Sequence, residues 1–122
     1  MKRAYLGTGL IGGGLAQAAA GRGDEVVAWN RTIEKAQALE AFGVTVADSA
    51  AKAVEGVSRV HLALTSDPAV DAVLESVRDA LTDDAIVIDH STTSPEGTLR
   101  RAEAMEAAGV RYLHVPVFMS PE

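Results

Sequence analysis

Apolar and polar positions along this chain follow two alternating patterns, one typical of strands and one typical of helices. Short apolar runs have strand length at residues 2–6, 25–29, 44–46, 59–64, 85–88 and 111–115. The segments between them have helical spacing or helix-capping residues, at 10–20, 33–42, 49–54, 68–77 and 95–108. A helix between consecutive strands predicts parallel pairing. The pattern therefore predicts one α/β domain over residues 1–122, a doubly wound parallel sheet (Rossmann fold) of strand order 3-2-1-4-5-6.

Two of these elements also carry expectations about burial. Residues 85–88 are apolar at every position, which is typical of a strand covered on both faces of a parallel sheet. In the last helix, Leu99, Ala102 and Met105 form one apolar stripe opposite arginine and glutamate, so this stripe is expected to face the core.

Three glycines follow the first strand at a spacing suited to phosphate binding. Gly7, Gly9 and Gly12 stand at G-x-G-x-x-G spacing before an alanine-rich helix. In this arrangement the first glycine permits a tight turn, the second lets phosphate approach the backbone, and the third lets helix and strand pack closely. The helix N-terminus offers unpaired N–H groups to the anion. We expect the pyrophosphate of a dinucleotide to lie against Gly7, Thr8, Gly9, Leu10, Ile11 and Gly12.

The second strand ends in a polar corner about 20 residues after the glycine loop, where such folds bind the adenosine ribose. An acidic residue here would bind the 2′-hydroxyl and repel a 2′-phosphate, but this chain has Asn30, Arg31 and Thr32, with Lys35 one helical turn on. Arg31 can form paired charge-assisted hydrogen bonds to phosphate. The corner therefore favours NADP over NAD. The alternative is that Thr32 only caps the next helix while Arg31 and Lys35 are surface charges.

Composition argues against several other classes of protein. The chain has 122 residues, 48% of them hydrophobic, which suits one domain with its own core. A net charge of -6 argues against a nucleic-acid partner, because such a surface needs a basic face. With no cysteine and three scattered histidines, neither a disulfide nor a metal site is expected. The lack of a signal-peptide core or a membrane-length apolar run favours a cytoplasmic protein with no membrane partner.

Several motifs, in order along the chain, resemble one enzyme family. Together with the glycine loop and residues 29–32 (WNRT), residues 89–95 (DHSTTSP) make the chain similar to the β-hydroxyacid dehydrogenases. That family includes 3-hydroxyisobutyrate dehydrogenase and 6-phosphogluconate dehydrogenase. The resemblance implies an oxidoreductase that transfers hydride between NADP(H) and a small-molecule carbonyl or hydroxyacid substrate.

The resemblance also implies roles for residues after the fourth and fifth strands. Those expected to flank the ribose and nicotinamide are Leu64, Thr65, Ser66 and Thr92. Those expected to border the substrate are Ser91 and Thr92. In the family, the catalytic lysine lies on a second, all-helical domain that also forms most of the dimer, and this chain ends at Glu122 before that domain. We therefore expect the chain alone to be inactive, its exposed C-terminal end to self-associate, and the full-length enzyme to be a homo-oligomer.

The last strand departs from the family pattern. Where family members carry D-A-P-V-S-G-G, whose serine and glycine amides receive the substrate carboxylate, this chain has HVPVFMSP at residues 114–121. Phe118 and Met119 add bulk at that place. We expect Phe118 to contact a substrate that is larger or less polar than a small hydroxyacid.

Two alternatives stay open. Imine reductases have a similar cofactor domain with an Asn-Arg-Thr corner, but their lack of the Asp-x-Ser-Thr segment ranks them second. The other alternative is a non-catalytic module that binds NADP as a sensor. Within this chain His90 and His114 are candidate proton donors, although a histidine at a strand end is more often structural. His61, in mid-strand, is expected to be structural.

Overall fold

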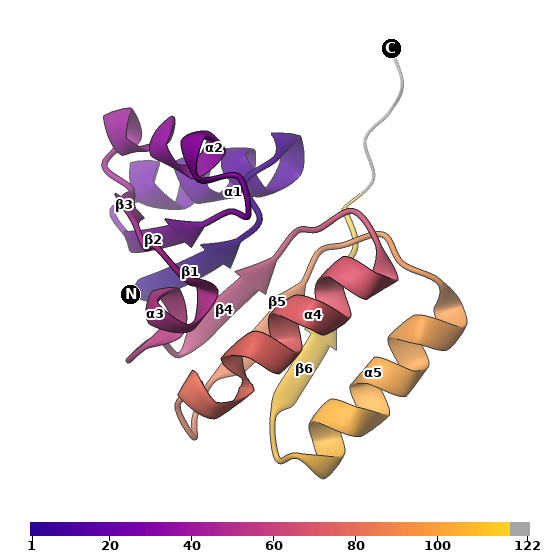
Figure 1. Cartoon of the computed structure of the whole chain (residues 1–122). Helices are drawn as coiled ribbons and strands as arrows, with labels where there is room; N and C mark the ends of the chain where they lie inside the picture. The colour runs from indigo at the N-terminus through magenta and orange to yellow at the C-terminus, as the bar shows by residue number, and fades with distance from the viewer. Residues whose placement is uncertain (118–122) are drawn as a thin grey trace.

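Six parallel strands form the centre of the molecule, which a computed structural model describes over residues 1–117 (Figure 1). They pair in the order β3-β2-β1-β4-β5-β6, so the predicted topology is confirmed. The strands are β1 (Lys2–Leu6), β2 (Glu25–Trp29), β3 (Thr45–Val46), β4 (Arg59–Leu62), β5 (Ile86–Asp89) and β6 (Arg111–His114). The helices are α1 (Leu10–Gly21), α2 (Ile33–Gln37), α3 (Ala50–Val54), α4 (Asp67–Val77) and α5 (Pro95–Ala107), with 3-10 turns η1 (Glu40–Phe42) and η2 (Arg78–Ala80). None of these helices has the length and apolar character needed to cross a membrane.

Helices cover β1 and β2 on both faces of the sheet. In Figure 1, α1 and α2 lie on one side, and α3, α4 and α5 lie on the other. Successive strand residues alternate between the two layers, because neighbouring side chains of a strand point to opposite faces. Tyr5 packs with Ala16 and Ala19 of α1, whereas Ala4 and Leu6 pack in the larger core with residues of α3 and α4. This alternation fixes which side chains reach each face at the strand ends.

Among residues 1–117, helices cover the β5–β6 part of the sheet on one face only. Val87 is buried in the larger core, but Ile86 and Ile88 point to the opposite face and are only half-buried. Leu113, paired with Ile88 across β5 and β6, is 52% exposed. The expectation that residues 85–88 are covered on both faces is therefore wrong for the two isoleucines. The reason is that α1 packs mainly on β1 and β2.

The helix α5 does not turn its whole apolar stripe to the core. Leu99 is 62% exposed, while only 4% of Arg101 is exposed. The facing helix α4 explains this difference. The Arg101 guanidinium donates from Nε to Asp71 Oδ1 at 2.8 Å and from Nη2 to Asp67 Oδ1 at 2.7 Å. Two carboxylates thus make an arginine a buried residue of α5, and Met105 is the fully buried member of the expected stripe.

The helix predicted at residues 33–42 is shorter in the structure. α2 ends at Gln37, the turn η1 follows, and Gly43 at φ 85° leads toward β3. Ala36 and Leu39 are buried as the helical spacing predicts, but Phe42 is exposed.

Candidate functional site

The glycine loop joins β1 to α1 at the carboxyl edge of the sheet. Gly7 has φ 98°, a left-handed conformation that favours glycine, and a Cβ there would collide with the carbonyl oxygen of Ala63. A Cβ on Gly12 would collide with the carbonyl oxygen of Gly7. Gly9 differs, because no surrounding part of the chain lies within 4 Å of the place its Cβ would take. The loop is closed at its first and third glycines and open at its second, which fits a backbone that receives phosphate.

The first turn of α1 presents unpaired backbone N–H groups. Gly9 is the N-cap residue and supplies no capping side chain, and the first turn contains no acidic residue. Amides of a first helical turn have no partner within the helix, so those of residues 10–12 point out of its start. Beside them, the Thr8 hydroxyl is buried without a hydrogen-bond partner in the described part of the chain. An anion with several oxygens would satisfy these donors.

Asn30 connects the glycine loop to the end of β2. Its Oδ1 accepts a hydrogen bond from the N–H of Thr8 at 2.8 Å, and its Nδ2 donates to the carbonyl oxygen of Thr32 at 2.9 Å. Where the sequence predicts a donor to phosphate, the structure has an amide that bridges two backbone segments. Asn30 therefore couples the position of the loop to that of the polar corner.

The other corner residues are open to solvent. Arg31, Thr32 and Lys35 are exposed, and neither basic side chain forms an ion pair within residues 1–117. Thr32 is the N-cap residue of α2, but its hydroxyl makes no capping hydrogen bond. Arg31 lines a cavity of 410 Å³ together with Trp29, Leu64 and residues of α4. The planar groups of Trp29 and Arg31 suit the face of a nucleobase.

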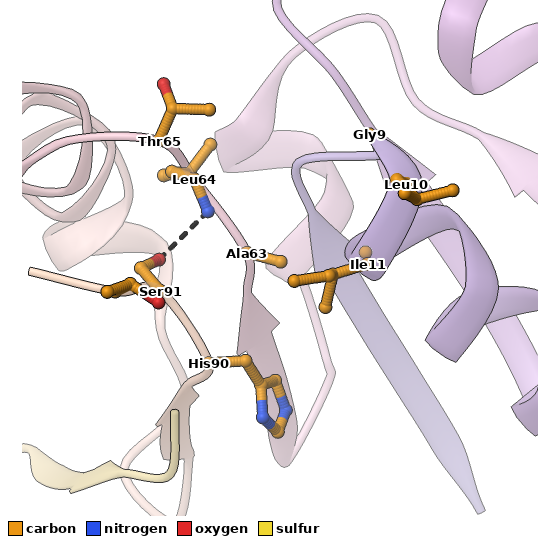
Figure 2. Close-up of a pocket in the computed structure, with 10 residues that line it drawn as sticks. Gly9, Leu10, Ile11, Ala63, Leu64, Thr65, His90 and Ser91 are labelled. Atoms are coloured by element: carbon orange, nitrogen blue, oxygen red, sulfur yellow. Dashed lines mark hydrogen bonds between the residues drawn. The ribbon is translucent and has the colours of Figure 1, made fainter. Parts of the chain in front are cut away.

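A second cavity, of 340 Å³, lies between the glycine loop and the ends of β4 and β5 (Figure 2). Its lining residues are Gly9, Leu10, Ile11, Gly12, Ala63, Leu64, Thr65, His90, Ser91 and Thr92. Leu64 lines both cavities, so they adjoin. Together their linings run from Arg31 to the ends of β4 and β5.

Ser91 supports the wall of the second cavity. Its hydroxyl accepts from the N–H of Leu64 at 2.9 Å, a bond that Figure 2 shows. Its own N–H donates to Asp89 Oδ1 at 2.9 Å, and its carbonyl oxygen accepts from His114 Nε2 at 2.8 Å. Ser91 is buried, whereas Thr92 is exposed. Of these two residues expected at the substrate, only Thr92 is freely accessible in the structure.

At the start of α4, Thr65 lines the cavity, whereas Ser66 and Asp67 accept hydrogen bonds within the chain. Thr65 is exposed in the cavity wall. Ser66 is the N-cap residue of α4, and its Oγ accepts from the N–H of Ala69 at 3.3 Å. Asp67, the first residue of α4, accepts from the N–H of Ser94 at 3.0 Å. This N–H and then Arg101 lower the pKa of Asp67.

A fully buried carboxylate, Asp89, lies behind the same wall. It accepts hydrogen bonds from the N–H of Ser91 and from the hydroxyl of Tyr112. Burial, followed by the bond to Asp89, raises the pKa of Tyr112, so this hydroxyl keeps its proton and remains a donor. No pattern in the sequence indicates a role for either residue. The available signal was an aspartate that closes an otherwise apolar strand.

The two candidate proton donors already use ring nitrogens within the chain. His114 Nε2 donates to the carbonyl oxygen of Ser91. His90 lines the cavity, but its Nδ1 lies 3.0 Å from the carbonyl oxygen of Val115 and its Nε2 lies 2.9 Å from His61 Nδ1. Phe118 lies outside the described residues, so its contact with substrate stays a prediction. Residues 1–117 contain no group of three potential ligands that could hold a metal ion.

The sequence matches a family model over residues 2–119, described as the NAD binding domain of 6-phosphogluconate dehydrogenase. The chain belongs to this family. Glyoxylate/succinic semialdehyde reductase 1 of Arabidopsis thaliana is 30% identical over 121 residues. The NAD(+)-dependent, decarboxylating 6-phosphogluconate dehydrogenase of Haloferax volcanii is 32% identical over 111 residues. These alignments cover 96% and 88% of this chain, but 42% and 37% of those two proteins.

Solved structures agree with the family assignment. The 3-hydroxyisobutyrate dehydrogenase of Mycobacterium tuberculosis, solved with L-serine, has a TM-score of 0.93 and 27% identity, covering 98% of this chain and 41% of that one. An imine reductase of Streptomyces aurantiacus has a TM-score of 0.86 and 30% identity, covering 93% and 40%. The resemblance to β-hydroxyacid dehydrogenases is confirmed for this domain. The chain spans about two fifths of the length of the relatives it matches.

Proposed function

We propose that this chain is the NADP(H)-binding domain of an oxidoreductase that transfers hydride between NADP(H) and a carbonyl- or hydroxyacid-type substrate. The observation that carries the proposal is the open, uncapped glycine loop beside two adjoining cavities. Membership of an NAD-binding family supports a pyridine dinucleotide as the ligand. The nicotinamide would supply the hydride chemistry, while the chain binds and orients it.

The proposal assigns the lining residues to the parts of the dinucleotide. The residues that hold the pyrophosphate are Gly7, Thr8, Gly9, Leu10, Ile11 and Gly12. Those that bind the 2′-phosphate, with Asn30 fixing the corner, are Arg31, Thr32 and Lys35. Those that flank the ribose, nicotinamide and substrate are Leu64, Thr65, Ser66, Ser91, Thr92 and, by sequence alone, Phe118.

Preference for NADP over NAD is part of the proposal. Arg31 and Lys35 are exposed and available to a phosphate. Residues 30–32 include no carboxylate to bind a free 2′-hydroxyl. A relative named as NAD(+)-dependent means that family membership does not decide the cofactor, so the argument rests on the corner residues.

Calorimetric titration of the full chain with NADPH and NADH in parallel tests the proposal. We expect NADPH to bind about tenfold or more tightly than NADH, because one charge-assisted hydrogen-bond pair is worth at least that factor. If neither dinucleotide binds, the domain has no working cofactor site on its own and the proposal fails in this form.

Replacing Arg31 tests the 2′-phosphate assignment. Arg31→Ala should weaken NADPH by about 2 kcal/mol, roughly thirtyfold, and leave NADH nearly unchanged. The control is Arg100→Ala, which removes an exposed arginine from α5, away from both lining sets. Equal losses for the two dinucleotides would contradict the assignment.

The proton donor for a carbonyl is proposed to lie outside residues 1–117. His90 and His114 already use ring nitrogens in hydrogen bonds within the chain. The second candidate function is imine reduction, which the Streptomyces aurantiacus structure favours. Turnover of hydroxyacids against cyclic imines by a full-length protein would separate the two. Cofactor binding without any turnover would favour a non-catalytic NADP-binding module.

Partners and location belong to the same proposal. We place the protein in the cytoplasm, supported by the absence of cysteine, with a small molecule as substrate and neither nucleic acid nor membrane as partner. Exposed Leu113 and Val115 support self-association at the C-terminal end. We also propose that the full-length enzyme is a homo-oligomer.

A further inference from the structure

Two histidines, His90 in the wall of the second cavity and His61 behind it, belong to a chain of hydrogen bonds that crosses four strands. Arg3 Nη1, on β1, lies 3.1 Å from Nε2 of His61 on β4. His61 Nδ1 lies 2.9 Å from Nε2 of His90, directly after β5. His90 Nδ1 lies 3.0 Å from the carbonyl oxygen of Val115, directly after β6. The dinucleotide assignment uses none of these side chains.

The groups at the two ends of this hydrogen-bond chain determine which ring nitrogens of His61 and His90 carry a proton. A guanidinium can only donate, so His61 Nε2 accepts from Arg3 and carries no proton. The proton of a neutral His61 is then on Nδ1, which donates to His90 Nε2. A carbonyl oxygen can only accept, so His90 Nδ1 donates to Val115. One assignment satisfies all three bonds, and it requires both imidazoles to be neutral.

Packing holds the rings in this geometry. His61 is 7% exposed, and Tyr5 stacks on it with ring centroids 4.4 Å apart and planes 7° apart. The rings of His61 and His90 are parallel within 6°, with centroids 5.2 Å apart. At the far end, Arg3 Nε donates to Asp24 Oδ2 at 3.1 Å. Figure 2 shows His90 beside Ser91 in the cavity wall.

We propose that His61 is a positioning residue that acts through His90 to hold the β5–β6 side of the cofactor cavity in place, and that uptake of a proton opens this hydrogen-bond chain. His90 directly precedes Ser91, which binds the N–H of Leu64. Val115 is held at both ends, because its N–H donates to the carbonyl oxygen of Asp89 at 2.8 Å and its own carbonyl accepts from His90. The cavity role rests on the proposed function.

Neither imidazole in this series of hydrogen bonds has a free nitrogen that could take up a further proton. On His61 Nε2 it would face the Arg3 guanidinium, and on His90 Nε2 it would face the N–H of His61. Burial, and then the charges of nearby groups, lower the pKa of His61 to about 3. The groups responsible are His90, Arg3, Arg22 and Arg59. Tyr5 is neutral, and the carboxylate Asp24 is already paired with Arg3. A proton added at either of these nitrogens therefore breaks a bond of the hydrogen-bond chain.

Nitrogen-15 NMR of the imidazole rings in the full chain tests the hydrogen-bond chain directly. At about pH 7.5 we expect His61 and His90 to carry their protons on Nδ1, whereas His114, the internal reference, carries its proton on Nε2. As the pH falls, the amides of Ser91 and Val115 should shift together with the ring resonances of His61 and His90. A proton on Nε2 of His61 would overturn the proposal. This measurement needs no cofactor, so it is decided separately from the proposed function.

The pH dependence of NADPH binding tests the positioning role. His90→Asn can still donate to the carbonyl of Val115 but cannot take up a proton. Between about pH 7.5 and pH 5.5, NADPH should weaken about fivefold more for the wild type than for His90→Asn, the loss expected for one hydrogen bond. Protonation of the NADPH phosphates affects both proteins alike. Equal pH dependence would overturn the positioning role, and no binding by either protein would overturn it together with the proposed function.

Discussion

The two halves of the sheet build the same edge by different means. In β1–α1–β2 the edge is made of backbone, with a left-handed Gly7, a Gly12 that has no room for a Cβ, and uncapped amides at the start of α1. In β4–β5–β6 it is made of buried side-chain hydrogen bonds around Ser91, Asp89 and His61. The glycine-loop half depends on the absence of side chains, and the other half depends on particular polar atoms. Substitutions that add bulk should therefore destabilise the glycine-loop half most. Substitutions that remove a hydrogen-bond acceptor should destabilise the other half most.

Bulk in the glycine loop should give the largest loss of stability. Gly7→Ala places a methyl group against the carbonyl of Ala63 in a left-handed conformation, so the free energy of unfolding should fall by about 3 kcal/mol or more. The control is Gly14→Ala within α1, where nothing lies within 4 Å of the new Cβ. This change should raise the free energy of unfolding by about 1 kcal/mol. Urea denaturation measures both, and a Gly7→Ala variant as stable as the wild type would contradict the steric account.

Loss of Asp89 is the matching change in the second half. Asp89→Ala leaves the buried N–H of Ser91 and the hydroxyl of the half-buried Tyr112 without their acceptor, which should cost about 2–3 kcal/mol of stability. Tyr112→Phe removes one of the two bonds and should cost about 1 kcal/mol. Asp83→Ala, at an exposed position, is the control. Thermal and urea unfolding would rank the stabilities of the three variants. An Asp89→Ala variant no less stable than Asp83→Ala would rule out a structural role for the buried carboxylate.

Asn30 allows a finer comparison, because each end of its amide has its own partner. Asn30→Ala loses both bonds and should cost about 1–2 kcal/mol of stability. Asn30→Asp keeps the acceptor for the Thr8 N–H, so its stability loss should be smaller. Its negative charge beside Arg31 should weaken NADPH more than NADH, as parallel titrations would show. If both variants are equally unstable, the bond to Thr8 does not hold the loop.

The smallest expected effect is a pH dependence of stability that comes from His61. Its folded-state pKa is lowered from 6.5 to about 3. Above pH 6.5 both folded and unfolded states are neutral, so this contribution to stability is complete. As the pH falls toward 3, the unfolded state takes up a proton that the folded state refuses, and stability is lost across that window. The loss should reach about 1 kcal/mol near pH 5.5.

Unfolding of the wild type and of His61→Gln at two pH values isolates this contribution. Glutamine cannot titrate, so the stability difference between the two proteins should shrink as the pH is lowered from about 7.5 to about 5.5. A difference that stays constant would contradict a neutral His61 in the folded state.

The glycine-loop half could be predicted because its determinants are local in the sequence. Glycine spacing and the alternation of strands and helices depend on residues a few positions apart. The side-chain network of the other half is set by pairs distant in the chain. Arg101 is buried because it pairs with Asp67 and Asp71, which lie 34 and 30 positions before it in the chain. His61 and His90 are 29 positions apart, and neither predicts the other.

Two expectations show a further limit of local patterns. Asn30 lies at the predicted corner, but its amide is used by neighbouring backbone, which residue type alone does not reveal. Residues 86–88 of the apolar run do lie in a strand, but the pattern cannot say which element covers each face. Coverage depends on where α1 packs across the sheet, and α1 packs mainly on β1 and β2.

The start of α1 lacks a side-chain cap, so an anion bound there would complete the helix. The amides of residues 10–12 would gain partners only in the complex, and the Thr8 hydroxyl would gain one with them. Ordering of the first turn and occupancy of the loop then become a single event. Hydrogen exchange at these amides would slow on binding, and the melting temperature would rise with ligand concentration. The resistance of this domain to unfolding would thus follow the nucleotide supply around it.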